Sequence, residues 1–283
     1  MKLKNNRALS FIVVICVYLI AMISANIIYY YLPYEFWLSL LIADLFATVI
    51  VFLFSLLFNN ASVYDPYWSV LPIVVVVAFA ITNGLNLARI LILIAICVWG
   101  IRLTANWAYT FKNLNHQDWR YTMLKHKTKA FYPIVNLLGI HVFPTLVVYF
   151  CILPAVFAFH MDLSFNAGSF IFFALSIGAV VLQGMSDCQM RKYRNNKTSP
   201  FNRIGFWKYS RHPNYLGEIL MWWGIALSFI SVVPSMWYLM AGALINTLMF
   251  LCVSIPMADK KQSKKEGFYE YKKQTRMLFP IKK

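Results

Sequence analysis

The chain has 283 residues, of which 60% are hydrophobic and only 13% are charged, and its 26 basic and 10 acidic residues give a formal net charge of +16. Soluble domains carry about 25% charged residues, so the composition excludes an ordinary soluble protein and indicates an integral membrane protein. The basic residues cluster beside apolar stretches, which favours the positive-inside rule over nucleic-acid binding as the source of the charge.

The apolar runs predict an all-α fold, a polytopic bundle of about eight transmembrane helices, since a helix needs roughly 20 apolar residues to cross a bilayer. The first run is too long for a cleavable signal and is predicted to be a membrane helix. Pro72 interrupts the short third helix, and Pro144 and Pro154 are expected to kink the fifth. The predicted helices are 9–32, 36–58, 67–82, 85–107, 140–160, 168–190, 214–232 and 235–257.

With both termini in the cytoplasm, all basic residues except Arg89 fall on the cytoplasmic side. The segments 108–133 and 188–213 and the tail after Asp259 then form one basic surface. Such a surface fits an anionic cytoplasmic ligand or the headgroups of anionic membrane lipids. The membrane would be the inner membrane of a bacterium or the endoplasmic reticulum of a eukaryote. We expect an N-terminal helix pair at 1–58 and a membrane domain at 59–283.

A polar and aromatic group begins at Asp65, near the start of the third predicted helix. Tyrosine and tryptophan at helix ends usually form interface belts. Arg102 lies inside an apolar helix at a depth similar to that of Asp65, so the two are expected to form a buried pair. For Asp65, Arg102 and Tyr121, a belt and a functional role both stay open. The candidate catalytic residues of this group are Asp65, Tyr67, Trp99, Arg102 and Tyr121.

Four polar residues of the sixth predicted helix fall within about 80° of one another at about 100° per residue. They are Gln183, Asp187, Arg191 and Arg194. Arginine forks suit phosphate groups, and a carboxylate or an amide suits ribose hydroxyls or a base edge. The stripe therefore indicates a polar ligand, with a helix-end salt bridge and snorkelling arginines as the structural alternative.

The segment 211–218 places two bases, Arg211 and His212, directly before a helix that begins at Pro213. A helix N-terminus favours an anion because its amide groups are free and its dipole is positive there. Glu218 lies inside the apolar helix and has to find a partner across the bundle, for which Arg194, Arg211 and Lys260 are candidates.

Other catalytic and metal motifs do not occur in the sequence. There is no P-loop, no soluble dinucleotide fingerprint and no HExxH, CxxC or GxSxG pattern, and the histidines lack ligand spacing. The five cysteines are scattered through apolar runs. Neither a metal site nor a disulfide framework is predicted.

Residues 60–283 resemble the steroid 5-alpha-reductase-like family of membrane proteins, and most closely its DUF1295 group. The resemblance rests on Asp187, Arg194, the run from Gly205 to Glu218 with its RHPNYLGE stretch, and Trp222-Trp223-Gly224. Asp65-Pro-Tyr-Trp-Ser, Trp99-Gly-Ile-Arg-Leu and Asp118-Trp-Arg-Tyr also resemble that group. The RHPNYLGE stretch is shared with a wider superfamily that includes sterol reductases and isoprenylcysteine carboxyl methyltransferases.

The resemblance implies a helical bundle that holds NADPH at its cytoplasmic side beside a pocket for a flat, lipid-like enone. The cofactor-contacting positions that it implies are Gln183, Asp187, Arg194, Asn214 and Glu218, with Arg211, His212 and Tyr215 as their neighbours and Arg203 and Lys260 on the adenine and phosphate side. Arg191 joins the cofactor-binding candidates as a member of the stripe. The family's substrate-side acid falls near Asp65 and its partner tyrosine near Trp99, where this sequence departs. A tryptophan cannot donate a proton to a carbonyl, so Tyr67, Tyr109 or Tyr121 supplies the hydroxyl, or the substrate is not a 3-keto steroid.

Three functions follow as hypotheses. The first is NADPH-dependent reduction of a conjugated carbon–carbon double bond in a lipophilic substrate, such as a steroid, hopanoid, polyprenol or fatty enone. The second is methyl transfer from S-adenosylmethionine to a prenylated or lipid substrate, which the shared RHPNYLGE stretch allows and the arginine pair of the stripe disfavours. The third is non-catalytic lipid binding or transport.

Overall fold

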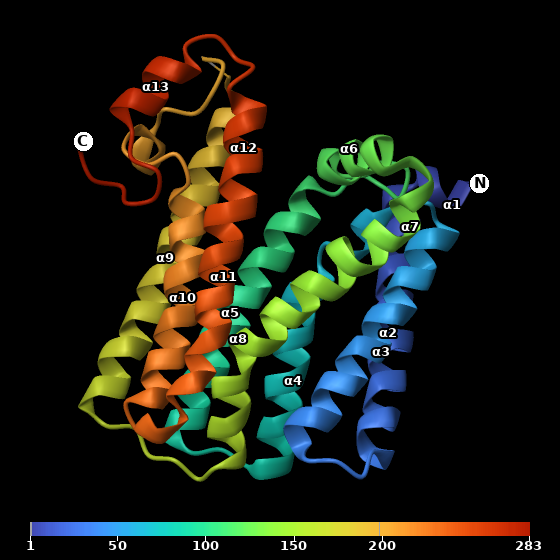
Figure 1. The fold of residues 1–283 in the computed structure, drawn as a ribbon, viewed down its shortest axis with the longest axis vertical. Coiled ribbons are helices and arrows are strands. Elements are labelled where there is room, and N and C mark those ends of the chain that lie inside the picture. The colour runs from blue at the N-terminus through green and yellow to red at the C-terminus, as the bar shows by residue number, and fades with distance from the viewer. Residues whose placement is uncertain (1, 198) are drawn as a thin grey trace. The chain divides into compact units, whose positions relative to one another are not determined.

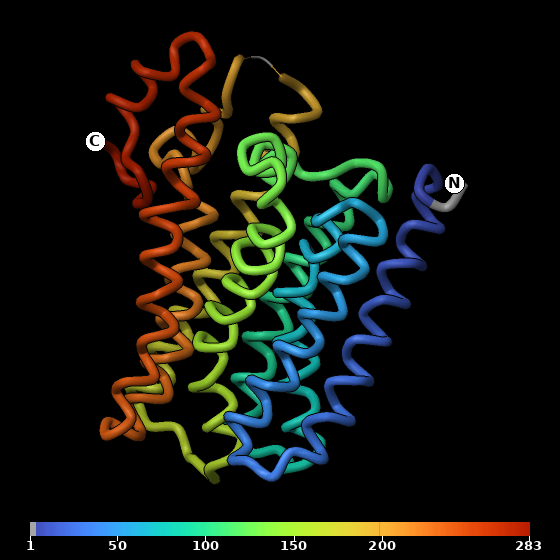
Figure 2. The backbone as a smooth tube through the Cα atoms, turned by 45° about the vertical axis from the view of Figure 1, so that its right-hand side comes forward, coloured from blue at the N-terminus to red at the C-terminus, as the bar shows by residue number. Residues whose placement is uncertain are grey.

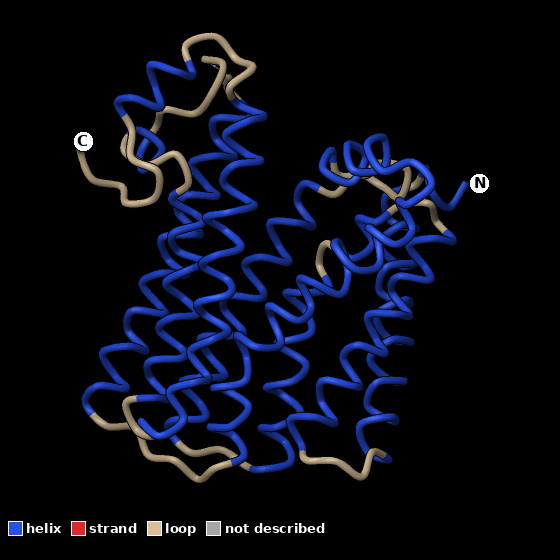
Figure 3. The backbone as a smooth tube through the Cα atoms, viewed as in Figure 1, coloured by secondary structure: helices blue, strands red, loops and turns tan. Residues whose placement is uncertain are grey.

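The computed structural model describes residues 2–197 and 199–283, and within them it contains helices, turns and loops but no strand (Figure 3). Seven helical stretches in the described residues are long and apolar enough to cross a membrane. These observations confirm an all-α, multi-pass membrane protein. The seven stretches are Arg7–Tyr31, Phe36–Leu57, Ala61–Asn83, Leu87–Thr110, Trp119–His160, Ala167–Asn195 and Pro234–Gln262.

The chain forms two compact units, Met1–Val75 with Gly100–Tyr149 and Val76–Trp99 with Phe150–Lys283. Three helices begin in one unit and end in the other: α4 (Tyr67–Asn83), α5 (Leu87–Thr110) and α8 (Phe143–His160). The expected boundary between residues 58 and 59 stays a prediction.

The first unit begins with α1 (Lys2–Asn5), α2 (Arg7–Tyr31) and α3 (Phe36–Leu57), followed by the short η1 (Ala61–Tyr64). The blue helices α2 and α3 run side by side (Figures 1 and 2). Ala21, Ala43 and Ala47 are buried in their shared core, where small side chains let two helices approach closely in a membrane.

The connection expected at 108–133 is largely helical, and the fifth predicted helix starts well before residue 140. The helical run before α8 consists of α6 (Trp119–Thr128), η2 (Lys129–Phe131), α7 (Tyr132–Val135) and the π-helical η3 (Asn136–Val142). The Asp118 side chain caps α6 by accepting a hydrogen bond from the Arg120 N–H. Hydropathy does not reveal this helix because α6 is polar and has no buried residue.

The second unit contains α9 (Ala167–Asn195), α10 (Pro213–Ile230), η5 (Pro234–Met240), α11 (Ala241–Met249), η6 (Phe250–Ser254) and α12 (Ile255–Gln262). The predicted helix at 214–232 is present as α10, although it is not among the seven spanning stretches. Helices α9 and α10 lie side by side (Figures 1 and 2). A Cβ at Gly217 would lie 2.5 Å from Cγ of Gln183 and 2.7 Å from the carbonyl oxygen of Ala179, so this approach requires glycine.

The C-terminal tail folds back on the segment that precedes α10. Ser210 and Arg276 form an isolated parallel bridge. Phe201, Phe268 and Tyr271 form a small buried cluster that joins this segment, which includes η4 (Gly205–Lys208), to α13 (Phe268–Gln274). The tail is therefore an ordered part of the second unit.

Candidate functional site

A buried carboxylate that accepts hydrogen bonds from three neutral side chains lies in the core of the second unit. The indole N–H of Trp99 lies 2.9 and 3.0 Å from the two carboxylate oxygens of Glu218, and the indole N–H of Trp222 lies 3.0 Å from Oε1. The Gln183 amide donates to Oε2 at 3.1 Å. All four side chains are buried. Hydrogen bonds to a charged acceptor are stronger than neutral ones, so they offset part of the cost of burying the charge.

These hydrogen bonds place Glu218 and Trp99. Glu218 accepts hydrogen bonds from two indoles and an amide, and a basic partner for it stays a prediction. Trp99 stands where the family has a tyrosine, and its indole binds Glu218. It belongs to the second unit, whereas Asp65 belongs to the first.

The polar stripe is confirmed as one helical face, because all four of its residues lie within α9. Its exposure increases along the helix: Gln183 is buried, Asp187 and Arg191 are half-buried, and Arg194 is exposed. The inner end of the stripe is thus part of the core, and the outer end presents a carboxylate and two guanidinium groups toward the surface of the unit.

The two bases ahead of α10 bind a carboxylate of the protein itself. The guanidinium group of Arg211 lies 3.2 Å from Oδ2 of Asp259, and Nε2 of His212 lies 2.9 Å from Oδ1. Lys272 approaches the same carboxylate at 3.4 Å. The Arg211 guanidinium also donates to the carbonyl of Thr275 at 2.8 Å. The anion held next to this helix N-terminus is therefore Asp259.

This ionic cluster connects α12 to the tail. The Tyr271 hydroxyl donates to the carbonyl of Trp207 at 2.6 Å, and burial raises the pKa of Tyr271, so the phenol stays a donor. The ring of His212 stacks on that of Tyr215, with centroids 5.2 Å apart. The cluster therefore has a structural role, because it links α12 to the C-terminal tail.

The remaining expected cofactor residues of the second unit have accessible side chains. Arg203 is exposed and its guanidinium carbon lies 4.7 Å from the ring centre of Phe201. Lys260 is exposed, and Asn214 is half-buried at the start of α10. These three side chains can still reach a ligand.

In the first unit, Asp65 and Tyr121 are brought together. The Tyr121 hydroxyl donates to Oδ1 of Asp65 at 2.7 Å, although 56 residues separate the two in sequence. Of the three tyrosines considered as hydroxyl donors, Tyr121 is the one that reaches Asp65, whereas Tyr109 is exposed.

One expectation about Asp65 is not met, and one of the alternative tyrosines has another partner. Among the described contacts of Asp65 there is no ion pair with Arg102, and the guanidinium group that acts on its charge is Arg120. Tyr67 donates instead to Oδ1 of Asp44 at 2.9 Å.

Asp44 is a polar residue that the sequence analysis missed. It lies in α3 with 3% of its surface exposed and accepts the hydroxyl of Tyr67. Its neighbourhood continues through Thr48, whose hydroxyl lies 3.0 Å from that of Thr145, and Tyr64, 2.8 Å from Thr145. An ionisable residue inside an apolar helix is itself a signal of a functional or structural site, and that signal was available at Asp44.

The two units thus offer different chemistry. Asp65 with Tyr121 is a carboxyl–phenol pair that can hold or transfer a proton at the phenol oxygen. The outer stripe of α9 offers the guanidinium groups and the carboxylate that bind phosphates and ribose hydroxyls.

Comparisons with known proteins show the family to which the chain belongs. Residues 51–275, well over half of the chain, match the family model described as "Protein of unknown function (DUF1295)", so the chain belongs to that family. An uncharacterized protein of Schizosaccharomyces pombe is 29% identical over 223 residues, which are 69% of this chain. The chain spans 64% of the length of that relative. No solved structure matches the chain.

Proposed function

We propose that this member of the DUF1295 family is an integral membrane reductase that uses NADPH to saturate a conjugated carbon–carbon double bond in a lipophilic substrate. The observation that carries the proposal is the outer stripe of α9, where Asp187, Arg191 and Arg194 follow one another toward the surface of the second unit. The resemblance to steroid 5-alpha-reductase-like proteins supports the same proposal. NADPH, when bound, supplies a hydride for the β carbon of an enone.

The donor set of the second unit fits such a cofactor. Arg191 and Arg194 suit its phosphates, and the carboxylate of Asp187 suits ribose hydroxyls. Arg203 and Lys260 are exposed and add positive charge. Gln183 and Glu218 bond to each other in the core, so we assign them to positioning α9 against α10, close to the ligand. Arg211 and His212 bind Asp259, and we assign them to positioning the start of α10.

On the substrate side, we propose that Asp65 and Tyr121 act as one unit. The carboxylate orients the phenol, and the phenol donates a hydrogen bond to the substrate carbonyl as enolate charge develops on its oxygen. A proton from water then adds to the α carbon of the enolate, which completes the addition of two hydrogens across the double bond.

Ligand-dependent thermal stability tests the cofactor. A ligand at about 100 times its dissociation constant stabilises a protein by about 2.7 kcal/mol. We expect purified protein in detergent to gain thermal stability from NADPH, and to gain less from NADH because the 2′-phosphate contact is lost. Arg194→Ala and Asp187→Asn should reduce the gain from NADPH, and the melting temperature of ligand-free Arg194→Ala should stay near that of the wild type.

The matched control is Lys192→Ala, which removes an exposed cation of the same helix on the opposite face. It should leave the NADPH response intact. A gain in stability from S-adenosylmethionine and none from NADPH would overturn the reductase in favour of a methyltransferase. No response to either ligand would contradict both enzymatic functions and leave the non-catalytic one.

A further inference from the structure

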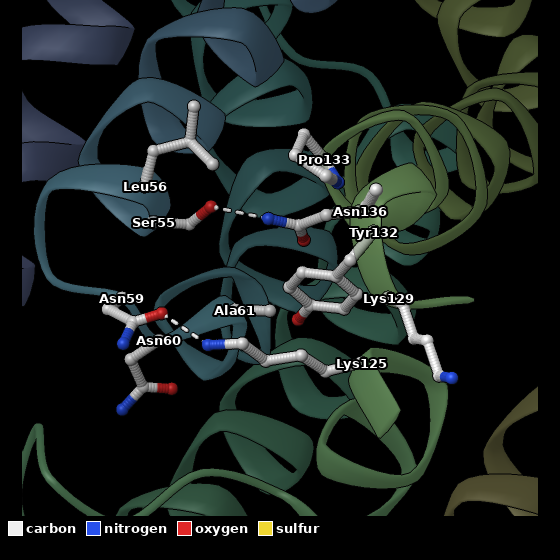
Figure 4. Close-up of a pocket in the computed structure, with 11 residues that line it drawn as sticks. Ser55, Leu56, Asn59, Asn60, Ala61, Lys125, Lys129, Tyr132, Pro133 and Asn136 are labelled. Atoms are coloured by element: carbon white, nitrogen blue, oxygen red, sulfur yellow. Dashed lines mark hydrogen bonds between the residues drawn. The ribbon is translucent and has the colours of Figure 1, made fainter. Parts of the chain in front are cut away.

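A cavity of about 320 Å³ lies in the first unit, at the end of α3 and beside the helical run that leads into α8 (Figure 4). Its wall includes Ser55 and Leu56 of α3, Lys125 and Lys129, and the buried pair Tyr132 and Asn136. Asp65 and Tyr121 are not part of this wall. The groups assigned to the reaction therefore do not line the cavity, although Tyr121 packs against the small cluster that contains Tyr132.

Two buried polar atoms of the wall have no hydrogen-bond partner among the described residues. The hydroxyl of Tyr132 is one and Oδ1 of Asn136 is the other. Tyr132 is 9% exposed and Asn136 is 2% exposed. The Asn136 amide nitrogen donates to Oγ of Ser55 at 3.1 Å, which fixes the side chain with its oxygen as the open acceptor. A buried polar atom left unsatisfied costs about 1–3 kcal/mol, so these two atoms point to a ligand.

The charge of the wall selects the kind of ligand. Nζ of Lys125 lies 2.7 Å from Oδ1 of Asn59 and 5.7 Å from the ring centre of Tyr132. Figure 4 shows the Tyr132 hydroxyl directed toward Lys125. Lys129 adds a second ammonium group, and none of the described residues that line the cavity is acidic. The wall therefore favours an anion with oxygen acceptors, such as a phosphate ester.

The unpaired acceptor adds a second requirement. Oδ1 of Asn136 can only accept a hydrogen bond, and a phosphate diester carries no donor at neutral pH. The ligand must then bring a hydroxyl or an amine as well. An amine is disfavoured beside two lysines, so a hydroxyl is the matching group.

Exposed apolar side chains occur in the wall of the cavity and in the helical run that contributes to it. Leu56 of its wall is 43% exposed, and Ile134 and Leu138 of the facing helical run are 57% and 55% exposed. The helical run Trp119–His160 has 42 residues, about twice the length that crosses a bilayer core. Its lysine-bearing start can therefore lie at headgroup level while Leu138 lies among acyl chains.

We propose that this cavity binds the hydroxyl-bearing phosphate headgroup of a phospholipid. The phosphate accepts hydrogen bonds from the Tyr132 hydroxyl and the two lysines, a headgroup hydroxyl donates to Oδ1 of Asn136, and the acyl chains lie along Leu56 and Leu138. Binding at this cavity is independent of the proposed reductase activity.

The test uses full-length protein purified in detergent and returned to nanodiscs or mixed micelles. Lipid retention is measured by native mass spectrometry, and thermal stability is measured in parallel. Phosphatidylglycerol should be retained in preference to phosphatidylcholine, and also in preference to phosphatidic acid, which lacks the headgroup hydroxyls. Tyr132→Phe should weaken phosphatidylglycerol retention about tenfold, the effect of one hydrogen bond to a charged group.

Tyr132→Phe removes a hydroxyl that bonds nothing in the described protein, so its melting temperature in phosphatidylcholine should match that of the wild type. Tyr31→Phe, at an exposed tyrosine of the same unit, should change neither readout. The pair Lys125→Ala/Lys129→Ala should also lose the preference, whereas Lys112→Ala/Lys127→Ala, with the same loss of charge at exposed positions, should keep it.

Three results would overturn the proposal. One is equal retention of phosphatidylglycerol and phosphatidylcholine by the wild type. Another is an unchanged preference in Tyr132→Phe. The third is protection by soluble glycerol 3-phosphate as strong as that by phosphatidylglycerol, which would assign the cavity to a free phosphate ester and not to a lipid.

Discussion

At the scale of single residues, Glu218 is the best-defined group of the second unit. Three side chains donate to its carboxylate, and each comes from a different place in the sequence: Trp99 in α5, Gln183 in α9 and Trp222 in α10. Such a carboxylate ties three helices together through one side chain. Its burial and these three donors favour a structural contribution that supports the neighbouring stripe.

We predict that Glu218→Gln destabilises the protein by about 1–3 kcal/mol. The glutamine amide places an N–H where the native carboxylate accepts from an indole, so two donors face each other. Thermal unfolding in detergent measures the effect.

Glu266→Gln is the control, since the same substitution there affects an exposed side chain. A melting temperature for Glu218→Gln that equals that of Glu266→Gln would show that the hydrogen bonds to Glu218 contribute nothing to stability.

The residue scale also shows what a sequence can and cannot reveal. The spacing of Gln183, Asp187 and Arg194 predicted one helical face, which α9 confirms. The partners of Glu218 and Asp65 could not be predicted, because Trp99 and Tyr121 lie 119 and 56 residues away from them. Pairing across a bundle depends on helix rotation, and apolar periodicity fixes rotation poorly when all faces of a helix are apolar.

At the scale of elements, the contact between α9 and α10 determines where the polar stripe lies. Gly217 allows the two backbones to approach, with the Ala179 carbonyl 2.7 Å from the position of a Cβ. Backbone atoms cannot move aside as a flexible side chain can.

We predict that Gly217→Ala destabilises the second unit by about 1–3 kcal/mol, since the methyl group overpacks the interface. Gly178→Ala on α9 is the matched control, because a Cβ there meets nothing within 4 Å. In that helix the control should be neutral or raise stability by up to about 1 kcal/mol. The melting temperatures of the two variants decide the point: equal values would contradict close packing at Gly217.

A second element-scale prediction concerns the tail. Asp259→Asn weakens the contacts with Arg211, His212 and Lys272. The backbone N–H of Arg276 donates to the carbonyl of Tyr209. We expect that amide to exchange its hydrogen faster in the variant, as measured by hydrogen–deuterium exchange of peptides covering 270–279.

Glu270→Gln provides the comparison, since it changes an exposed carboxylate of α13 without touching the cluster. Exchange in Asp259→Asn that remains as slow as in Glu270→Gln would mean that the ionic cluster does not hold the tail.

Hydropathy predicted the starts of three helices closely. The predicted starts at 36, 168 and 235 differ by one residue or less from those of α3, α9 and η5, because apolar side chains begin sharply there. Hydropathy failed at α6, where a capped polar helix has no apolar signal, and at η3, a π-turn directly before Pro144. A proline lacks the N–H of the regular ladder, and the π-turn accommodates that loss.

At the scale of the whole molecule, the distribution of basic residues carries the prediction of orientation. All of the 26 basic residues except Arg89 fall on one side if both termini are cytoplasmic. We predict that green fluorescent protein fused to the C-terminus fluoresces and that alkaline phosphatase fused there is inactive. Active phosphatase and dark green fluorescent protein at this terminus would contradict the predicted topology.

The central claim is that the protein adds hydrogen across a conjugated double bond at the expense of NADPH. It is tested most directly with the purified protein, lipid extracted from its own membrane and NADPH deuterated at the nicotinamide C4. The account predicts that mass spectrometry finds lipid products that carry two added hydrogens, one of them deuterium from the cofactor, and that Tyr121→Phe greatly reduces their yield. A complete absence of deuterium in the lipids, with methylated products formed on addition of S-adenosylmethionine, would contradict it.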